Sequence, residues 1–311
     1  MKFSSKKSFF SVVVLYLLVA FHTYAQPNYP RNPQDAKIIY SDLIHFTAAY
    51  QELATNTDTL QVLQNRYFDR GSDGLKEFVK RHQLTPELLK YAISENPDRY
   101  ELIPAFLSNI NEIEKQYQSL VHDFHNAIPN AMYPPTYLLV GANRGIGQAS
   151  LVGQLITVTR PIDNMDKLQN IMAHELSHFQ QAIAMGGQKY GELYTSPNNM
   201  LGLSLREGGA EFLASLVVGD ITQSEALDYI EKNEIRLKEQ FLTDLETQNK
   251  DFWFWASLDQ KLYPKLLGYA MGYKICKNFY EIAPNKTAAL LEIMNIQDAE
   301  AFLKSSGYFK F

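Results

Sequence analysis

Two histidines four residues apart, His174 and His178, constrain the fold of this sequence more than any other feature. Residues four apart on a helix project from the same face, one turn from each other. Two imidazoles in that position can share one Zn²⁺ at about 2.0–2.1 Å. The surrounding apolar residues recur at helical spacing and form a stripe: Leu168, Met172, Leu176, Phe179 and Ile183. We therefore expect a helix with one metal-facing side and one side packed on a core.

Glu175 directly follows the first histidine and completes a His-Glu-x-x-His motif. Its place on the helix suits a base that takes a proton from a metal-bound water. We do not expect Glu175 to be a metal ligand. The alternative is a surface helix with two incidental histidines. A second acidic segment downstream argues against that alternative.

That segment runs from Arg206 to Phe212 and contains Glu207 and Glu211, again four residues apart. A catalytic zinc needs a third protein ligand and an open position for water. We expect Glu207 to be that ligand and Glu211 to accept the second ring N–H of a ligand histidine, although the roles could be reversed. The pair Gly208-Gly209 indicates close approach to another helix, for which the histidine helix is the first candidate. The alternative places both glutamates on a solvated face.

The combination of His-Glu-x-x-His and a helix with Glu-Gly-x-Ala-Glu resembles the gluzincin metallopeptidases. In that group the glutamate before the glycine is the third zinc ligand, which corresponds to Glu207. The 28 residues between His178 and Glu207 imply an enlarged loop. The stretch from Tyr137 to Phe302 resembles more closely a bacterial family of predicted zinc-dependent proteases of unknown substrate. The resemblance rests on the glycine-bearing loop before a strand and on the segments 174–181, 207–212 and 267–274.

Tyr269 and Tyr273 lie on one face of a further helical segment. Peptide hydrolysis develops an oxyanion that needs a hydrogen-bond donor besides the metal. The resemblance to gluzincins implies a tyrosine or a histidine in that role. We prefer Tyr273, with Tyr269 second. Because the chain has 19 tyrosines, a simple packing role is the alternative for each.

The apolar patterns predict an α+β fold that is mostly helical. Helical spacing runs from Asp35 to about His125, and short strands are expected at 137–140 and 151–159, as a hairpin or as neighbours. Helices follow again after Asp166. We divide the chain into a helical N-terminal region, 26–131, and a metallopeptidase domain, 132–311. The resemblance implies a zincin-like core in that domain, with a small sheet, the His-Glu-x-x-His helix and the glutamate-bearing helix.

The loop from Val140 to Gly147 looks like the phosphate-binding turn of short-chain dehydrogenases. It does not lie in a first βαβ unit and no Tyr-x-x-x-Lys pair follows, so the context argues against a dinucleotide site and an oxidoreductase. We interpret the segment as part of the substrate cleft instead. In zincins a strand borders the cleft and pairs with the extended substrate. Leu151–Thr159 is our candidate for that strand, with Asn143 and Arg144 on the cleft rim.

The first 25 residues have the pattern of a secretory signal peptide. Three lysines precede an apolar stretch, Phe9–Phe21, and small residues lead up to Ala25. The alternative is a membrane anchor, but 13 apolar residues reach only about 20 Å as a helix, whereas a bilayer core is about 30 Å thick. We expect export to the periplasm or the medium, with no stable membrane insertion after cleavage.

Charge and cysteine content narrow the function further. The 311 residues contain 29 Lys+Arg and 34 Asp+Glu, which argues against a nucleic-acid partner. Cys276 is the only cysteine, so multi-cysteine metal sites and intrachain disulfides are excluded. We expect an exported zinc peptidase with one Zn²⁺ per chain and a peptide or protein substrate. The alternative is a non-catalytic zinc-binding cell-envelope or scaffold protein, which would have no need of Glu175 as a base.

Overall fold

The structure is a computed structural model that describes residues 29–143, 145–195, 199–255 and 263–310. The expected signal peptide, residues 1–25, lies outside these ranges. The strands are β1 (Ile38–Ile39), β2 (Thr136–Leu139), β3 (Gly147–Ser150) and β4 (Gly153–Thr157). The α-helices are α1 (Ser41–Leu53), α2 (Thr59–Leu63), α3 (Asp73–His82), α4 (Pro86–Glu95), α5 (Pro97–Glu101), α6 (Ile103–Ser108), α7 (Ile110–Ala127), α8 (Met165–Met185), α9 (Gly187–Thr195), α10 (Met200–Val218), α11 (Ser224–Lys232), α12 (Glu234–Thr247), α13 (Leu267–Ile282), α14 (Lys286–Met294) and α15 (Ala299–Ser305).

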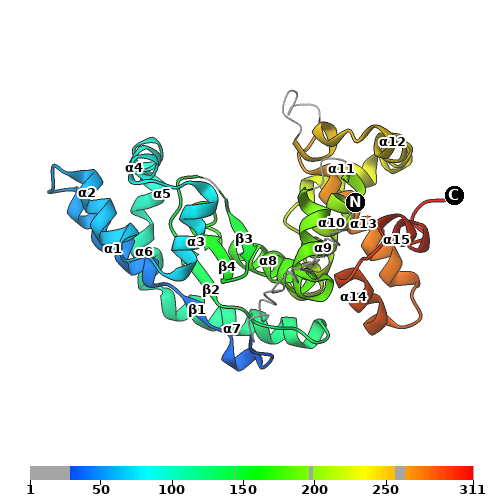
Figure 1. The fold of residues 1–311 in the computed structure, drawn as a ribbon, viewed down its shortest axis with the longest axis horizontal. Coiled ribbons are helices and arrows are strands. Elements are labelled where there is room, and N and C mark those ends of the chain that lie inside the picture. The colour runs from blue at the N-terminus through cyan, green and yellow to red at the C-terminus, as the bar shows by residue number, and fades with distance from the viewer. Residues whose placement is uncertain (1–28, 144, 196–198, 256–262, 311) are drawn as a thin grey trace, which may run out of the picture.

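The elements form two lobes joined by α8 (Figure 1). The sheet lobe comprises α1 to α7 with the four strands. The helical lobe comprises α9 to α15. Helix α8 contacts β3 and β4 on one side and α10 on the other. The prediction of a mostly helical α+β fold with a small sheet is confirmed. No helix of the described ranges has both the length and the apolar character needed to cross a bilayer.

The sheet has the order β1-β2-β4-β3. Strands β1, β2 and β4 are parallel, and β3 pairs antiparallel with β4. The expected neighbours, β2 and β4, are indeed adjacent. Two predictions were wrong. Ile38 and Ile39 were included in the helical spacing from Asp35 but form β1. Gly147–Ser150, expected as the end of the glycine-bearing loop 141–150, forms β3. Both short segments are ordered by backbone pairing with a neighbour, which side-chain periodicity does not reveal.

The strand order also corrects the expected cleft strand. Strand β4 lies inside the segment Leu151–Thr159, and both of its edges are paired, with β2 and with β3. A central strand has no free backbone groups to offer a substrate. Strand β3 is the edge strand on the side of α8. The physical reason is the tight turn at Leu151 and Val152, which folds β3 back onto β4.

Buried tyrosines attach the helices of the sheet lobe to the end of β2. The hydroxyl of Tyr67 donates to the carbonyl oxygen of Val140 at 2.7 Å and accepts from its N–H at 3.0 Å. The hydroxyl of Tyr100 donates to the carbonyl oxygen of Gly141 at 2.9 Å. These contacts satisfy backbone groups just beyond the last residue of the strand. Helices α1 to α6 and the sheet consequently share one core.

In the helical lobe, α10 packs tightly on both α8 and α13. A Cβ on Gly208 would lie 2.2 Å from the backbone carbon of Gly272, and a Cβ on Gly272 would lie 1.8 Å from the carbonyl oxygen of Ser204. Gly208 therefore allows contact with α13, not with the histidine helix as expected. Gly209 does face the histidine helix, where its missing side chain leaves room for Gln181.

Candidate metal centre

Three buried side chains from α8 and α10 converge at the interface between the two helices. Nε2 of His178 lies 3.0 Å from Oε2 of Glu207, and Nε2 of His174 lies 3.6 Å from the same oxygen. One ligand atom from each residue lies within 4.8 Å of the others. Tetrahedral zinc with ligands at about 2.0–2.1 Å requires donor atoms about 3.3 Å apart. The donor set therefore fits Zn²⁺ in both chemistry and spacing.

The two imidazole rings lie at 89° to each other, with centroids 4.5 Å apart. This arrangement points two nitrogen atoms at a common position instead of stacking the rings. Within the described ranges, no other group of three or more His, Cys, Asp or Glu side chains is close enough to hold a metal ion.

Each donor residue has a further buried contact that restricts its orientation. Nδ1 of His174 lies 3.2 Å from Oε1 of Glu211. Glu211 in turn accepts from the backbone N–H of Thr222 at 2.8 Å and from its hydroxyl. Glu211 thus lies beside the far nitrogen of His174 and outside the donor set.

Two further residues at the centre were not singled out from the sequence. Gln181 lies 3.0 Å from Nδ1 of His178. The guanidinium of Arg206 donates to Oε1 of Glu207 and lies 5.4 Å from the centre of the Tyr190 ring. Arg206 is the only cation in α10, and the only other charged residues of that helix are its two glutamates. This single cation in a long helical pattern was the sequence feature that could have identified Arg206.

Charges compensate one another inside this buried site. Burial lowers the pKa of His174. The charge of Glu211 and the hydrogen bonds with Glu207 and Glu211 have a larger, opposite effect, so the pKa of His174 is raised well above 6.5. Burial likewise opposes ionisation of Glu207, but Arg206 and His178 hold its pKa well below 4.5. In the absence of a cation, a proton on the imidazole of His174 therefore offsets part of the carboxylate charge. Binding of a divalent metal would displace such a proton.

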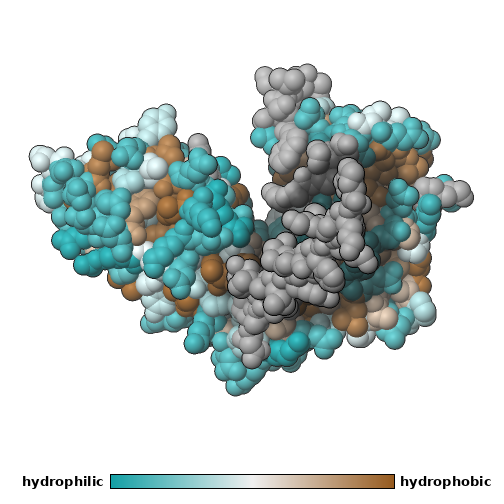
Figure 2. Space-filling model, in the orientation of Figure 1, coloured by the Kyte–Doolittle hydropathy of each residue, from teal (hydrophilic) through white to brown (hydrophobic). Residues whose placement is uncertain are grey.

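A cavity of about 630 Å³ opens beside His174 and Glu175. Its walls are β3, the loop after α10 and the start of α13, and Figure 2 shows the surface hollowed between the two lobes. Glu175 is 8% exposed and faces β3. A Cβ on Gly147 would lie only 2.7 Å from Oε1 of Glu175. Gly147 therefore allows the edge strand to approach the acidic side chain closely.

The model of one protein family matches residues 110–304 of the chain: the predicted Zn-dependent proteases called DUF2268. The match covers more than half of the sequence. The chain belongs to this family. The resemblance inferred from the motifs is thereby confirmed, and the buried His174, His178 and Glu207 form a metal-ligand group within the matched region. Neither the curated proteins nor the solved structures contain a significant match to the chain.

Of the two tyrosines on α13 in this family member, the structure brings Tyr269 to the centre. Its ring stacks on His174 at 6.3 Å and 13°, and it lines the cavity. Burial, followed by the charge of Glu207 and a hydrogen bond with it, raises the pKa of Tyr269 well above 10. Tyr273 instead packs against Phe212 and lies under Lys277. Tyr273, the tyrosine preferred from the sequence, lies one helical turn farther along α13 and is not among the residues that line this cavity.

The expected rim residues are placed only in part. Asn143 does not line the cavity beside Glu175. The residues of its loop and of β3 that do line the cavity are Ile146 and Gly147. The carbonyl oxygen of Asn143 accepts from Arg160 at 2.9 Å, and the φ of Asn143, 56°, places it in a turn. Arg144 lies outside the described residues.

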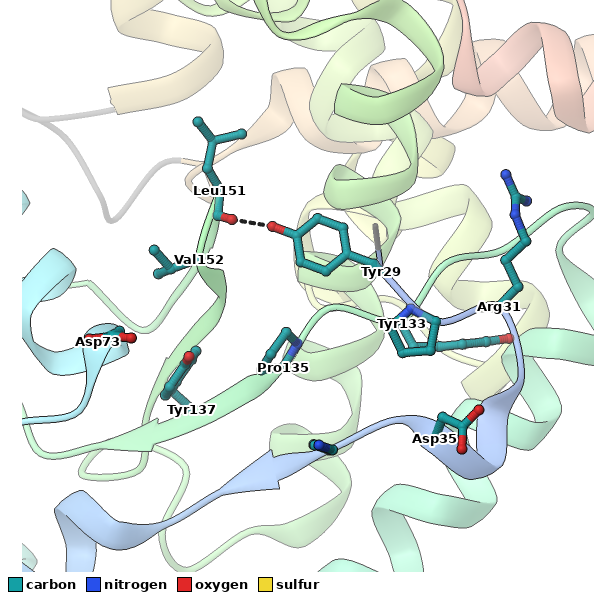
Figure 3. A pocket seen from close by; sticks show the side chains of 11 residues that line it. Tyr29, Arg31, Asp35, Asp73, Tyr133, Pro135, Tyr137, Leu151 and Val152 are labelled. Carbon is teal, nitrogen blue, oxygen red and sulfur yellow. Dashed lines mark hydrogen bonds between the residues drawn. The ribbon is translucent and has the colours of Figure 1, made fainter. Parts of the chain in front are cut away.

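A second and larger cavity, about 810 Å³, lies in the sheet lobe (Figure 3). Tyrosines 29, 133 and 137 line it together with Asp35 and Asp73, and the Tyr29 hydroxyl donates to the carbonyl oxygen of Leu151. None of its lining residues belongs to the metal-ligand group. Size alone does not identify a catalytic cavity, so the smaller cavity beside Glu175 is our candidate.

Proposed function

We propose that this chain is an exported zinc-dependent peptidase that hydrolyses peptide bonds in peptide or protein substrates. One Zn²⁺ per chain would be held by His174, His178 and Glu207. The observation that carries the proposal is a buried His/His/Glu donor set that adjoins an open cavity, with His174 and Glu175 both lining that cavity. Membership of a family of predicted Zn-dependent proteases supports the same reaction class.

Zinc bound there would act as a Lewis acid and lower the pKa of a water molecule. Glu175 has the place of the base: it lies next to His174 on α8, lines the cavity and is outside the donor set. Its carboxylate would accept the proton from the attacking water and later deliver it to the leaving amine. Contact with Gly147 restricts the positions that this carboxylate can take.

Tyr269 is the candidate donor to the carbonyl oxygen as negative charge develops on it. Its ring lies against His174 and its side chain borders the cavity. Burial and the neighbouring Glu207 raise its pKa well above 10, so it keeps its proton at neutral pH. A protonated phenol can donate one hydrogen bond to an oxyanion.

Strand β3 is the candidate surface for the substrate backbone. It is an edge strand, it contacts α8, and Gly147 brings it beside Glu175. An extended peptide can add to such an edge through main-chain hydrogen bonds, which gives affinity without strict sequence preference. This would place the scissile bond over Glu175.

Export is proposed from residues 1–25 alone. We expect the mature protein, recovered from the periplasm or the medium of the producing cells, to begin at Gln26. Edman sequencing or intact-mass measurement tests this. Recovery of the full-length chain from the cytosol would contradict export and leave the enzymatic proposal untouched.

The substitution Glu175→Gln tests the mechanism. We expect peptidase activity on a mixed peptide library to fall by about 10²–10⁴-fold, while zinc content stays unchanged. Glu225→Gln, an exposed glutamate in the first turn of α11, is the matched control and should retain full activity. Undiminished cleavage by Glu175→Gln would refute the base. If the purified wild type binds zinc and cleaves nothing, and cells retain function with Glu175→Gln, the scaffold alternative would replace the proposal.

A further inference from the structure

We infer that Gln181 is a positioning residue that selects the metal-binding tautomer of His178 and links that ligand to the backbone of α10. The inference rests on the proposed zinc site. Gln181 is fully buried on α8, three residues after His178. It belongs neither to the donor set nor to the residues that line the cavity.

The two ends of the Gln181 amide have different partners. Its Nε2 donates to the backbone carbonyl oxygen of Arg206 at 2.9 Å, and its Oε1 lies 3.0 Å from Nδ1 of His178. A carbonyl oxygen can only accept a hydrogen bond, so the NH₂ end must face Arg206. The oxygen end must then face His178. Because that oxygen can only accept, Nδ1 of His178 carries the hydrogen.

This assignment has a direct consequence for the metal. A neutral imidazole with its hydrogen on Nδ1 has its lone pair on Nε2. Nε2 of His178 is the atom that faces Oε2 of Glu207 at 3.0 Å. The backbone of α10 thus determines, through one amide, which nitrogen of a ligand on α8 is available to the cation.

Gly209 provides the space for this contact. A Cβ at position 209 would lie 2.8 Å from Nε2 of Gln181. Gly208, its neighbour, serves a different contact, with the backbone of α13. The two adjacent glycines therefore have separate roles, and the second one belongs to the metal centre.

The two histidines differ in the charge of their partners. Glu211 is an anion beside His174, whereas Gln181 is neutral beside His178. With a divalent cation bound, the charges of that cation and of Arg206 balance Glu175, Glu207 and Glu211. A second anionic partner would leave the buried site with an uncompensated negative charge, which is costly in a medium of low dielectric constant. A neutral amide orients the ring without that cost.

The neighbouring Gln180 is a matched control. It is also buried and also bridges two backbone groups: its Oε1 accepts from the N–H of Met132 at 2.9 Å and its Nε2 donates to the carbonyl oxygen of Met132 at 2.8 Å. Its Nε2 also donates to the carbonyl oxygen of Leu176 at 3.2 Å, and none of these three hydrogen bonds involves a metal ligand. Gln181→Met and Gln180→Met therefore each remove one buried amide and its hydrogen bonds, from adjacent positions on α8.

The experiment measures zinc affinity of the full mature chain by competition with a chromogenic chelator, independently of peptidase activity. We expect Gln181→Met to weaken zinc binding by about 10–100-fold and Gln180→Met to leave it unchanged, at similar loss of thermal stability. With Co²⁺ in place of zinc, only Gln181→Met should shift the visible absorption bands. Equal zinc affinities of the two variants would overturn the inference. A wild type that binds no zinc would overturn the proposed function as well.

Two more variants keep the test decisive if Gln181→Met does not fold. Gln181→Glu retains an acceptor for Nδ1–H of His178 and adds a negative charge beside the cation, so we expect zinc affinity at least equal to that of the wild type, together with lower thermal stability. Gly209→Ala should weaken zinc binding because its added methyl group displaces the Gln181 amide, whereas Gly187→Ala, at a position with open space, should not. Equal zinc affinities of Gly209→Ala and Gly187→Ala, or weaker zinc binding by Gln181→Glu than by Gln180→Met, would contradict the inference.

Discussion

The sheet lobe and the metal centre satisfy their buried polar groups in different ways. In the sheet lobe, neutral hydroxyls of Tyr67 and Tyr100 complete the backbone hydrogen bonds at the end of β2. At the metal centre, charged side chains face one another, as in the contact of Glu207 with Arg206. In the first arrangement both hydroxyls have backbone partners without an added ion. The second reaches charge balance with neutral histidines only when a cation is added.

This difference predicts which part of the molecule depends on zinc. Buried carboxylates without full compensation are expensive, whereas a hydroxyl paired with backbone groups is not. Helices α8 and α10 should therefore be coupled to metal binding, and the strands should not.

Removal of zinc by a chelator should have the largest effect. At free zinc about 1,000 times its Kd, binding stabilises the folded chain by about 4 kcal/mol, and chelation removes that contribution. Thermal unfolding would measure the loss, and hydrogen exchange should increase in α8 and α10 before it increases in β2 and β4. An unchanged melting temperature, or equal increases in exchange in both lobes, would contradict the contrast.

Tyr269→Phe should reduce kcat by about 10²–10³-fold, as loss of one oxyanion donor does. Tyr273→Phe is the matched control on the same helix face and should retain nearly full activity, because its ring packs against Phe212. Steady-state kinetics on one cleaved peptide would compare the two variants. A larger loss with Tyr273→Phe would restore the order of preference suggested by the sequence.

Gly147→Ala should reduce kcat/KM by about 100-fold, because displacement of a catalytic group by about 1 Å has effects of that size. The added methyl group would collide with the Glu175 carboxylate. Zinc content should not change, since Gly147 is outside the donor set. Gly187→Ala, at a position with open space around it, is the control. Loss of zinc from the Gly147 variant would show that the strand supports the metal site itself.

Tyr67→Phe should have the smallest effect on function and a clear effect on stability. It leaves the N–H of Val140 without the hydroxyl partner, at a cost of about 1–3 kcal/mol in the free energy of unfolding. Urea denaturation measures that cost. Zinc affinity should equal that of the wild type. Weaker zinc binding by this variant would mean that the two lobes are not independent.

The sequence was most informative where chemistry and helical spacing coincide. His174, His178 and Glu207 could be grouped because four-residue spacing and the need for a third ligand apply before any packing is known. The helix that carries the histidines, the helix that carries Glu207, and the adjacent strands β2 and β4 were predictable for the same local reasons.

The remaining features depend on how elements pack. Tyr269 and Tyr273 share a face of α13, so only the position of that helix along α10, set by Gly208 and Gly272, decides which one reaches the metal centre. Strand β3 could not be predicted from its own residues, because it forms a strand only through its backbone pairing with β4. Gln181 has no special spacing pattern, and its role follows from the carbonyl oxygen of Arg206 on another helix.

Zinc per chain, measured by mass spectrometry of the purified mature protein and of Glu207→Ala, decides whether His174, His178 and Glu207 hold the metal. We expect one zinc per chain in the wild type and almost none in the variant. Glu211→Ala should still bind zinc, with reduced affinity, because Glu211 contacts His174 and not the shared donor position. Zinc retained by Glu207→Ala and lost from Glu211→Ala would move the third ligand to Glu211. A wild type without zinc would contradict the account.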